Sequence, residues 1–227
     1  MGKSSVAVNL AIALQKLGKT VGLLDADIYG PSCPQLLSTA NAEVRLVGEN
    51  RLVPIECFGL KTISIGNLVP PDRATIWRGP MVHQALTQLL GGVEWGKLDY
   101  LILDLPPGTG DVHLTMMQSV KVDGAIVVST PQEVALADVR KFIDMCRQLT
   151  IPMAGVIENM AYFECAHGER YHLFGQGGAK RMSEALTIPF LGEIPLLEAI
   201  TQSGEKGTPY AIEDRGGIFE TIAKRIG

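Results

Sequence analysis

Short apolar runs alternate with segments of helical periodicity along most of the chain. Six runs have the length and composition of β-strands, and several lack polar alternation, which is typical of strands covered by helices on both faces. The predicted strands are residues 20–25, 60–66, 100–104, 124–130, 152–159 and 189–194. The predicted helices are residues 4–17, 81–90, 112–120, 134–149 and 179–186. These alternating elements predict an α/β fold with a doubly wound, mostly parallel sheet.

The segment from residue 28 to residue 59 is the least regular part of the pattern. We expect it to leave the sheet edge, with short strands around residues 44–46 and 51–55. No internal repeat or low-complexity linker divides the 227 residues, so we expect one domain. In such folds ligands bind at the carboxyl ends of the strands, which directs attention to residues just after each strand.

Composition narrows the classes of partner. Hydrophobic residues make up 46% and charged residues 19%, and the formal net charge is −4. This balance gives no reason to expect nucleic acid or an anionic membrane as a partner. No apolar run reaches membrane-spanning length, no cationic start followed by an apolar stretch suggests a signal peptide, and we expect no disulfide framework from the four scattered cysteines. We expect a cytoplasmic compartment, with an organellar targeting segment upstream of Met1 left open.

The chain starts with M-G-K-S-S, directly before the first predicted helix. Gly2, Lys3 and Ser4 match the end of the phosphate-binding motif G-x-x-x-x-G-K-[ST], whose first positions have no counterpart here. In that motif the lysine reaches the β- and γ-phosphates, the serine holds Mg²⁺, and the helix amides favour an anion. The alternative is an ordinary helix start, with Ser4 or Ser5 capping free amides.

A second candidate is the run Y-L-I-L-D-L-P-P-G-T-G-D, in which an apolar strand ends at Asp104. A carboxylate at the tip of a buried strand can hold Mg²⁺ or its water against a triphosphate. Gly108 and Gly110 would allow the following loop to move with the γ-phosphate. The alternative is a strand-capping aspartate followed by a surface turn.

Three further polar residues follow predicted strands. Asp25 and Asp27 lie in L-L-D-A-D-I-Y-G-P, where one carboxylate can orient the attacking water. We favour Asp27 for catalysis and leave Asp25 as a metal-shell or structural residue, since either can also bond the turn. Asn159 offers a donor and an acceptor to a purine edge, although asparagine after a strand is usually a turn residue.

Taken together, these runs resemble the Mrp/ApbC family of iron-sulfur cluster carrier ATPases, which includes the eukaryotic Nubp-type members. That family belongs to the wider MinD/ParA-like group of P-loop proteins. The matching runs occur in order over nearly the whole chain, and "DIYGPS" with "PPGTGD" separates the family from its relatives. The other runs are "GKSSVAVNLA", "WRGPM", "STPQEVALADVRK", "ENMAYF", "FGQGGA" and "GEIPL".

The resemblance implies ATP bound with Mg²⁺ in a homodimer that delivers iron-sulfur clusters to recipient apoproteins. It implies that Lys3 and Ser4 serve the phosphates and the metal, and that Ser5 serves the α-phosphate. It also implies that Asp27 serves the hydrolytic water, Asp104 the Mg²⁺ shell and Asn159 the adenine.

The phosphate loop departs from the family pattern, which reads K-G-G-x-G-K-[ST]. Only x-G-K-S is present, with Met1 at the x position, so the family's upstream lysine has no counterpart. We expect residues 1–227 to form a single P-loop ATPase domain that lacks the first strand and the first half of the loop. Nucleotide binding is therefore a firmer expectation than hydrolysis.

The second departure concerns the cluster ligands. Family members usually carry C-x-x-C after the "ENM" segment, and two such pairs bridge one cluster, here expected as [4Fe–4S], across the dimer axis. This chain has Cys165 and then Ala166, His167 and Gly168, with no second cysteine. Three alternatives are open. Either residues are missing from the sequence at this point, or Cys165 and His167 of two subunits ligate the cluster together. In the third alternative the site is degenerate and holds no cluster.

The remaining cysteines, Cys33, Cys57 and Cys146, are interpreted as structural, and His83, His113 and His172 are assigned no metal or general-base role. An alternative function is a MinD- or ParA-like positioning ATPase acting on membrane or DNA. The C-terminal run G-G-I-F-E-T-I-A-K-R-I-G has little positive charge, so we interpret it as a packed helix rather than a membrane anchor. A redox ATPase like the nitrogenase iron protein lacks the second cluster cysteine it would need.

Overall fold

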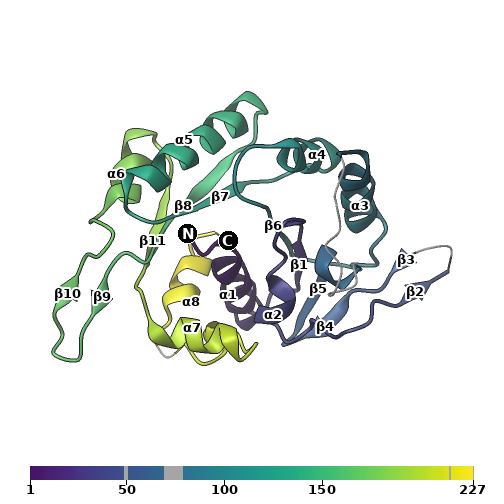
Figure 1. Cartoon of the computed structure of the whole chain (residues 1–227), viewed down its shortest axis with the longest axis horizontal. Helices are drawn as coiled ribbons and strands as arrows, with labels where there is room; N and C mark the ends of the chain where they lie inside the picture. Colours follow the sequence, from purple (N-terminus) through teal and green to yellow (C-terminus); the bar gives the residue numbers. More distant parts are fainter. Residues whose placement is uncertain (49–50, 69–78, 215, 227) are drawn as a thin grey trace.

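Two parallel sheets and eight α-helices make up the part of the chain described by this computed structural model, which covers residues 1–48, 51–68, 79–214 and 216–226 (Figure 1). The first sheet has the order β4 (Ile55–Cys57), β5 (Leu60–Ser64), β1 (Val21–Asp25), β6 (Tyr100–Asp104). The second has the order β11 (Phe190–Ile194), β8 (Met153–Asn159), β7 (Ala125–Ser129). Only β4 runs antiparallel to its neighbour in these sheets.

The helices and the remaining short elements connect and cover the sheets. The α-helices are α1 (Lys3–Lys16), α2 (Cys33–Leu36), α3 (Gly79–Gly91), α4 (Asp111–Ser119), α5 (Glu133–Gln148), α6 (Gly178–Ala185), α7 (Glu198–Glu205) and α8 (Ile218–Ala223). The 3₁₀ turns are η1 (Ile65–Asn67) and η2 (Tyr210–Ile212). Two antiparallel hairpins are formed by β2 (Leu46–Val47) with β3 (Arg51–Leu52), and by β9 (Phe163–Glu164) with β10 (Arg170–Tyr171).

All six predicted strands and all five predicted helices are confirmed, with ends that shift by one or two residues. The strand predicted to end at residue 66 stops at Ser64, because the Ser64 hydroxyl accepts the Gly66 amide and starts the η1 turn. Helix α7 and the β9–β10 hairpin were not predicted. Each hairpin strand has only two residues, and α7 has only two apolar side chains, Ala199 and Ile200, neither of which is buried.

The strands are apolar on both faces because helices cover both. Neighbouring residues of β1 enter different cores, with Leu23 packing beside α1 and Leu24 beside α3 and α4. Ile157 of β8 packs with the α1 core, whereas Val156 packs with α5 and α6. This arrangement confirms the doubly wound α/β fold. Within the described residues, no helix combines the length and the apolar content needed to cross a membrane.

The inner edges of the two sheets, β6 and β7, are not paired with each other in the described part of the chain. Helix α1 packs across both sheets, since its core includes the partly buried residues Ile102 of β6 and Ile126 and Val128 of β7. Leu101 of β6 remains 37% exposed. The carboxyl ends of β1, β6 and β8 thus lie around the start of α1.

A buried carboxylate holds the start of α6 against the second sheet. Glu158, which is 1% exposed, accepts hydrogen bonds from the amides of Gly177 (3.1 Å) and Ala179 (2.6 Å). Gly177 adopts a left-handed conformation with φ of 64°, and a Cβ added to Gly178 would lie 2.0 Å from the Pro131 carbonyl oxygen. The double glycine of "FGQGGA" therefore allows the backbone to pack closely beside the end of β7.

We expect Gly178→Ala to lower the free energy of unfolding by about 1–3 kcal/mol, because the new methyl group forces backbone to move away from backbone. Urea unfolding followed by circular dichroism measures the change. Gly91→Ala is the matched control, since a Cβ there meets nothing within 4 Å. Equal stability of Gly178→Ala and the parent chain would show that the close contact is relieved at no cost.

Candidate nucleotide-binding site

The carboxylates of Asp25 and Asp104 end neighbouring parallel strands and lie side by side. The β1–β6 register pairs Asp25 with Asp104, and both side chains are buried, at 0% and 4% exposure. Burial raises the pKa of Asp104, while a hydrogen bond from Ser4 and the positive charge of Lys3 lower it. Lys3, Ser4 and Asp104 therefore lie together, as the sequence predicted for a phosphate and magnesium site.

Helix α1 starts without a side-chain cap. Gly2 is its N-cap residue in a left-handed conformation (φ 74°, ψ 31°), and no side chain bonds the first-turn amides. The alternative in which Ser4 or Ser5 caps the helix is therefore wrong for this structure. An uncapped helix start leaves the amides and the positive end of the helix dipole available to an anion.

The Asp25 carboxylate accepts three hydrogen bonds around the loop that follows β1. Its Oδ1 accepts the Asp27 amide (3.1 Å), and its Oδ2 accepts the Cys33 amide (3.2 Å) and the Ser64 hydroxyl (2.9 Å). Burial, followed by the charge of Asp104, raises the pKa of Asp25 to about 6, although these three hydrogen bonds oppose the shift. Asp25 therefore organises this loop. Of the two roles that the sequence left open for it, metal shell or structure, this is the structural one.

This shift makes folding pH-dependent. Asp25 releases its proton near pH 6 in the folded chain and near pH 3.8 when unfolded, so stability falls as the pH rises through that window. The contribution has a slope of at most about 1.4 kcal/mol per pH unit, and Asp25→Asn should remove it. Urea unfolding in EDTA at a series of pH values measures both slopes. Parallel curves for the two proteins would contradict the assignment.

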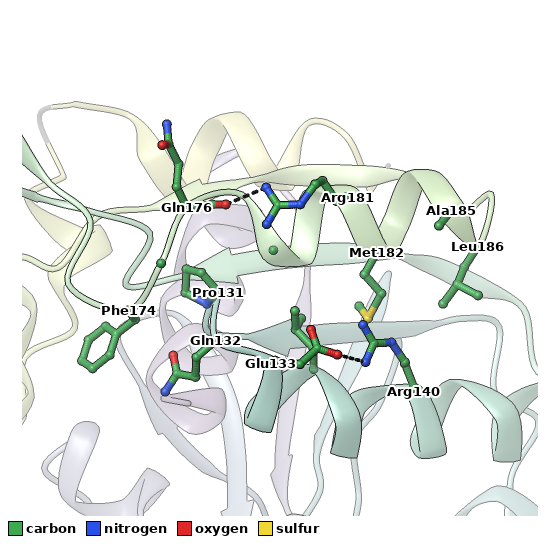
Figure 2. Close-up of a pocket in the computed structure, with 13 residues that line it drawn as sticks. Pro131, Gln132, Glu133, Arg140, Phe174, Gln176, Arg181, Met182, Ala185 and Leu186 are labelled. Carbon is green, nitrogen blue, oxygen red and sulfur yellow. Dashed lines mark hydrogen bonds and ion pairs between the residues drawn. The ribbon is translucent and has the colours of Figure 1, made fainter.

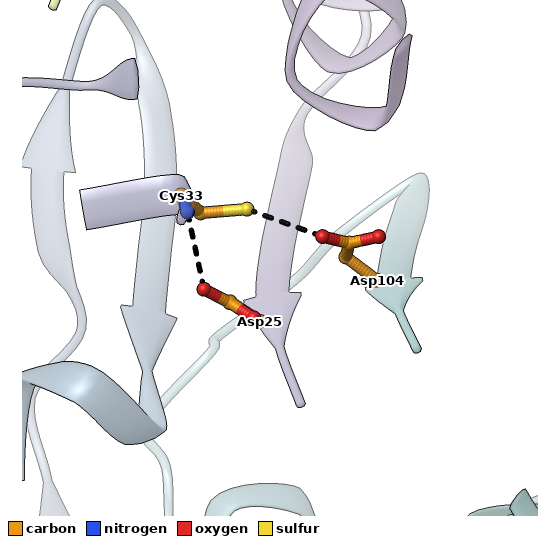
Figure 3. Close-up of side chains that lie close together, drawn as sticks. All are labelled: Asp25, Cys33 and Asp104. Atoms are coloured by element: carbon orange, nitrogen blue, oxygen red, sulfur yellow. Dashed lines mark hydrogen bonds between the residues drawn. The ribbon is translucent and has the colours of Figure 1, made fainter. Parts of the chain in front are cut away.

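Cys33 lies between the two aspartates (Figure 3). Its thiol donates to Oδ2 of Asp104 across 3.6 Å, and the side chain is fully buried. Burial, together with the charges of Asp25 and Asp104, raises the pKa of this thiol well above its usual value. The protonated thiol thus acts as a neutral donor that orients Asp104. Cys33 is structural, as expected, but it contacts the candidate metal ligand directly.

Asp27 follows in the same loop and is partly buried. Its Oδ1 accepts the amides of Tyr29 and Gly30, both at 3.2 Å, so it closes an Asx turn. Its charge acts on Asp104 and on His113, which places it on the same side of the sheet end. Oδ1 of Asp27 is therefore held in the turn, whereas Oδ2 has no hydrogen bond among the described residues.

Asn159 joins the end of β8 to the chain start. Its Nδ2 donates to the Met1 carbonyl (2.8 Å), and a Cβ on Gly2 would lie 2.6 Å from that nitrogen. Gly2 and Asn159 both line a pocket of about 330 Å³. The other lining residues are Ser5, Ser32, Gln35, Leu36, Met160, Pro195, Leu196, Leu197, Ile200, Thr201, Gly204 and Glu205. The lining combines apolar side chains such as Leu36 and Ile200 with polar ones, which suits a purine base.

Sequence reasoning missed the far wall of this pocket, which consists of Pro195–Leu197 and helix α7. The loop follows β11, so its place after a strand was a usable signal. Its leucines look like core residues, however, and the eight residues of α7 include too few apolar side chains to have predicted a helix there.

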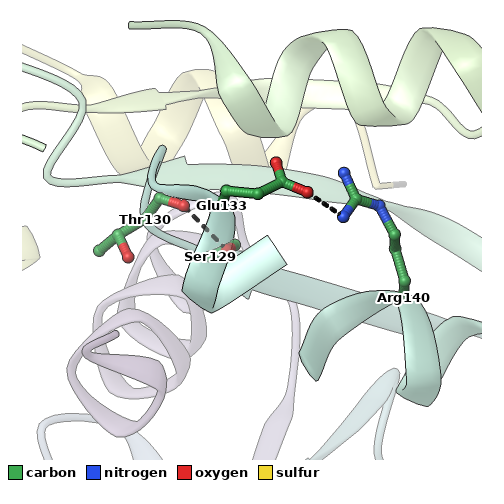
Figure 4. Close-up of polar contacts among 4 residues, drawn as sticks. All are labelled: Ser129, Thr130, Glu133 and Arg140. Carbon is green, nitrogen blue, oxygen red and sulfur yellow. Dashed lines mark hydrogen bonds and ion pairs between the residues drawn. The ribbon is translucent and has the colours of Figure 1, made fainter. Parts of the chain in front are cut away.

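A larger pocket of about 470 Å³ lies between α5 and α6, and none of the predicted nucleotide residues lines it (Figure 2). Leu136 and Met182 contribute apolar surface, and the Arg181 guanidinium donates to the Gln176 carbonyl (2.7 Å). At its rim, Glu133 and Arg140 form an exposed ion pair near the end of β7, where the Ser129 hydroxyl donates to the Thr130 carbonyl (Figure 4). The charges at this rim are satisfied within the chain.

Cys165 and His167 lie in the turn of the β9–β10 hairpin, which projects from the second sheet (Figure 1). The Gly168 amide donates to the Cys165 carbonyl, and the Cys165 amide donates to the Glu169 carbonyl, each at 2.9 Å. Cys165 is partly buried and His167 is exposed. Among the described residues, only Asp25, Cys33 and Asp104 form a group of three candidate metal ligands. A single hairpin therefore offers one thiol.

The other cysteines and histidines only partly match their predictions. Cys146 is fully buried, as expected for a structural cysteine, whereas Cys57 is only partly buried. His113 is 2% exposed, its Nδ1 has no hydrogen-bond partner in the described part of the chain, and its ring packs edge-to-face with that of Phe142. In the "WRGPM" run, residues 77 and 78 lie outside the described residues.

Comparisons with known proteins place the chain in a family. The iron-sulfur cluster carrier protein of Aquifex aeolicus (strain VF5) is 49% identical over 230 residues, which cover 99% of this chain and 63% of that protein. This chain thus spans less than two thirds of that relative. The nucleotide-binding protein from Archaeoglobus fulgidus, solved in complex with ADP, is 41% identical with a TM-score of 0.80, over 92% of this chain and 82% of that one.

A more distant structure supports the fold alone. The septum site-determining protein MinD from Pyrococcus horikoshii OT3, solved with Mg-ADP, has a TM-score of 0.72 at 20% identity, over 99% of this chain and 90% of that one. The family model described as NUBPL iron-transfer P-loop NTPase, of the ParA group, matches residues 1–226. With that match and a 49% identical relative, the chain belongs to the NUBPL iron-transfer family of P-loop NTPases.

Proposed function

We propose that the chain binds ATP with Mg²⁺ at the start of α1 and takes part in its hydrolysis. The observation that carries the proposal is the convergence of Lys3 and Ser4 with the buried carboxylate of Asp104. Lys3 would contact the β- and γ-phosphates and Ser5 the α-phosphate, while Gly2 allows the close backbone approach. Asp27 would hold the attacking water, and Asn159 would contact the adenine in the 330 Å³ pocket.

The residues present suit Mg²⁺, since a serine hydroxyl and a carboxylate are hard oxygen ligands beside a phosphate site. When bound, the metal would neutralise charge on the β- and γ-phosphates. The chain's own part is to favour the charged form of Asp104 through Ser4 and Lys3, which oppose the rise in its pKa caused by burial, and to orient it through the Cys33 thiol.

We further propose that residues 1–227 belong to one P-loop domain, in which an additional strand lies between β6 and β7 and leads into the phosphate loop. The unpaired facing edges of these strands, and the packing of α1 across both sheets, support this. A chain extended by upstream coding sequence should then bind Mg-ADP more tightly and unfold at a higher temperature. Unchanged affinity and melting temperature would count against the strand.

The proposed cargo is an iron-sulfur cluster, delivered to recipient apoproteins. The family and the carrier name of the Aquifex aeolicus relative support this, and Cys165 supplies an accessible thiol on a projecting hairpin. One thiol cannot hold a cluster alone, so we propose that two copies of the chain pair their hairpins. Two Cys165 thiolates then bridge a cluster, with His167 as the candidate second ligand of each copy.

Calorimetry of Mg-ADP and Mg-ATP binding, together with phosphate release, tests the nucleotide proposal. We expect saturable binding of one nucleotide per chain that depends on Mg²⁺, and slow release of phosphate from ATP. Absence of binding in a folded chain would refute the site. Binding without turnover would limit the proposal to nucleotide recognition.

A further inference from the structure

The hairpin that carries Cys165 begins at the wall of the candidate nucleotide pocket. Asn159 and Met160 line the pocket, and Tyr162 directly precedes strand β9. Ala161 alone lies between the pocket lining and the root of the hairpin. A displacement of the pocket wall therefore reaches the hairpin through a single intervening residue.

Backbone hydrogen bonds tie the hairpin root to the opposite pocket wall. The Leu196 amide donates to the Tyr162 carbonyl (2.7 Å), and the Ala161 amide donates to the Ile194 carbonyl (3.0 Å). Leu196 itself lines the pocket. The two walls and the hairpin root are thus held in one hydrogen-bonded unit, although they come from segments more than thirty residues apart in sequence.

Arg170 and His172, on the returning side of the hairpin, contact the same root. The Arg170 guanidinium carbon lies 4.3 Å from the centre of the Tyr162 ring, and Arg170 Nε donates to Glu164 Oε2 (2.8 Å). Nδ1 of His172 lies 3.1 Å from the Ala161 carbonyl oxygen. These contacts brace the root from the hairpin side, three residues before the Cys165 turn.

The backbone between the pocket and the root adopts an uncommon conformation. Met160 has φ of 54°, a left-handed value that is rare for a residue with a side chain. Such a torsion persists only where its surroundings hold it. Here the surroundings are the Asn159 contact with Met1 on one side and the Tyr162–Leu196 bond on the other.

We propose that Tyr162 and Arg170 couple the nucleotide pocket to the Cys165 turn. A purine nucleotide that packs against Leu196 and Met160 fixes the pocket wall, and the hairpin root is fixed with it. The coupling is reciprocal: the factor by which bound nucleotide stabilises the hairpin is also the factor by which a loosened hairpin weakens nucleotide binding. The proposal rests on the proposed nucleotide site and adds to it a route by which occupancy reaches the cargo-bearing thiol.

Amide hydrogen exchange of the nucleotide-free chain tests the route first. Arg170→Ala removes the contact with Tyr162, and we expect the Leu196 amide to exchange about two- to fivefold faster, as the loss of one exposed cation–π contact allows. Arg51→Ala is the matched control. Arg51 has the same side-chain exposure as Arg170, 58%, and pairs with Glu94 elsewhere on the surface. Unchanged Leu196 exchange in Arg170→Ala would overturn the coupling.

Addition of Mg-ADP provides the second readout, with binding measured separately by calorimetry. In the parent chain and in Arg51→Ala, ADP should slow exchange of the Cys165 and Gly168 amides, and Arg170→Ala should reduce this effect. ADP that binds without protecting the turn would overturn the coupling while leaving the nucleotide site intact. If ADP does not bind, the nucleotide site fails, and the Leu196 comparison still decides whether root and wall are coupled.

Discussion

Lys3→Ala is expected to weaken Mg-ADP binding by about ten- to a hundredfold, the range for loss of a hydrogen bond to a charged group. Lys3 lies at the start of an uncapped helix and is close enough to Asp104 to lower the pKa of that carboxyl. Its ammonium group is the positive charge that the structure places beside both the metal ligand and the helix amides. Calorimetry at fixed salt and Mg²⁺ measures the loss.

Lys19→Ala is the control for this experiment, because it removes the same charge from an exposed position three residues beyond the far end of α1. Neither side chain belongs to a core cluster, so both variants should fold, and a melting curve checks this before binding is compared. If Lys3→Ala bound Mg-ADP as tightly as Lys19→Ala, the phosphates would lie elsewhere. The 470 Å³ pocket between α5 and α6 would then be the next place to examine.

Cys165→Ser is expected to abolish iron and sulfide binding after anaerobic reconstitution. Cys165 is the only cysteine on the projecting hairpin, and a serine hydroxyl is a poor substitute for a thiolate on iron. Iron and acid-labile sulfide per chain, with the visible absorption of the cluster, measure the effect. Cys57→Ser, on partly buried strand β4, should keep the iron content of the parent chain.

His167→Ala separates two ligand sets in the same assay. Loss of iron in this variant supports ligation by Cys165 and His167 from two copies. Iron retained at the level of the parent chain assigns the remaining ligands to other groups, such as a small thiol or the recipient protein. Iron bound equally well by Cys165→Ser would remove the hairpin from the account altogether.

The continuous apolar runs made the strands predictable from sequence, because strands covered on both faces carry little else. Their division into two sheets among the described residues, where one was expected, was not predicted. The positions of Asp25 and Asp104 could also be predicted, since each ends such a run. Their shared contact with Cys33 could not, because it depends on how the β1 loop folds back over the paired strand ends. The hairpin and α7 are short and contribute no buried residue from β9 or α7, so their positions depend on tertiary contacts.

The hairpin root shows the same limit of sequence reasoning. Tyr162 and Leu196 resemble ordinary core residues in sequence, and only the folded chain brings their backbones within hydrogen-bonding distance. Asn159 was predicted from its place after a strand, yet its contact with Met1 became evident only in the structure.

Transfer of a cluster from the reconstituted chain to an apo-ferredoxin tests the central claim most directly. We expect the acceptor to gain its own cluster spectrum while the carrier loses iron, and Mg-nucleotide to change the rate. It also predicts that Cys165→Ser, treated in the same way, transfers nothing above the level of free iron and sulfide. A parent chain that binds no iron, or that transfers no more than Cys165→Ser, would contradict the account.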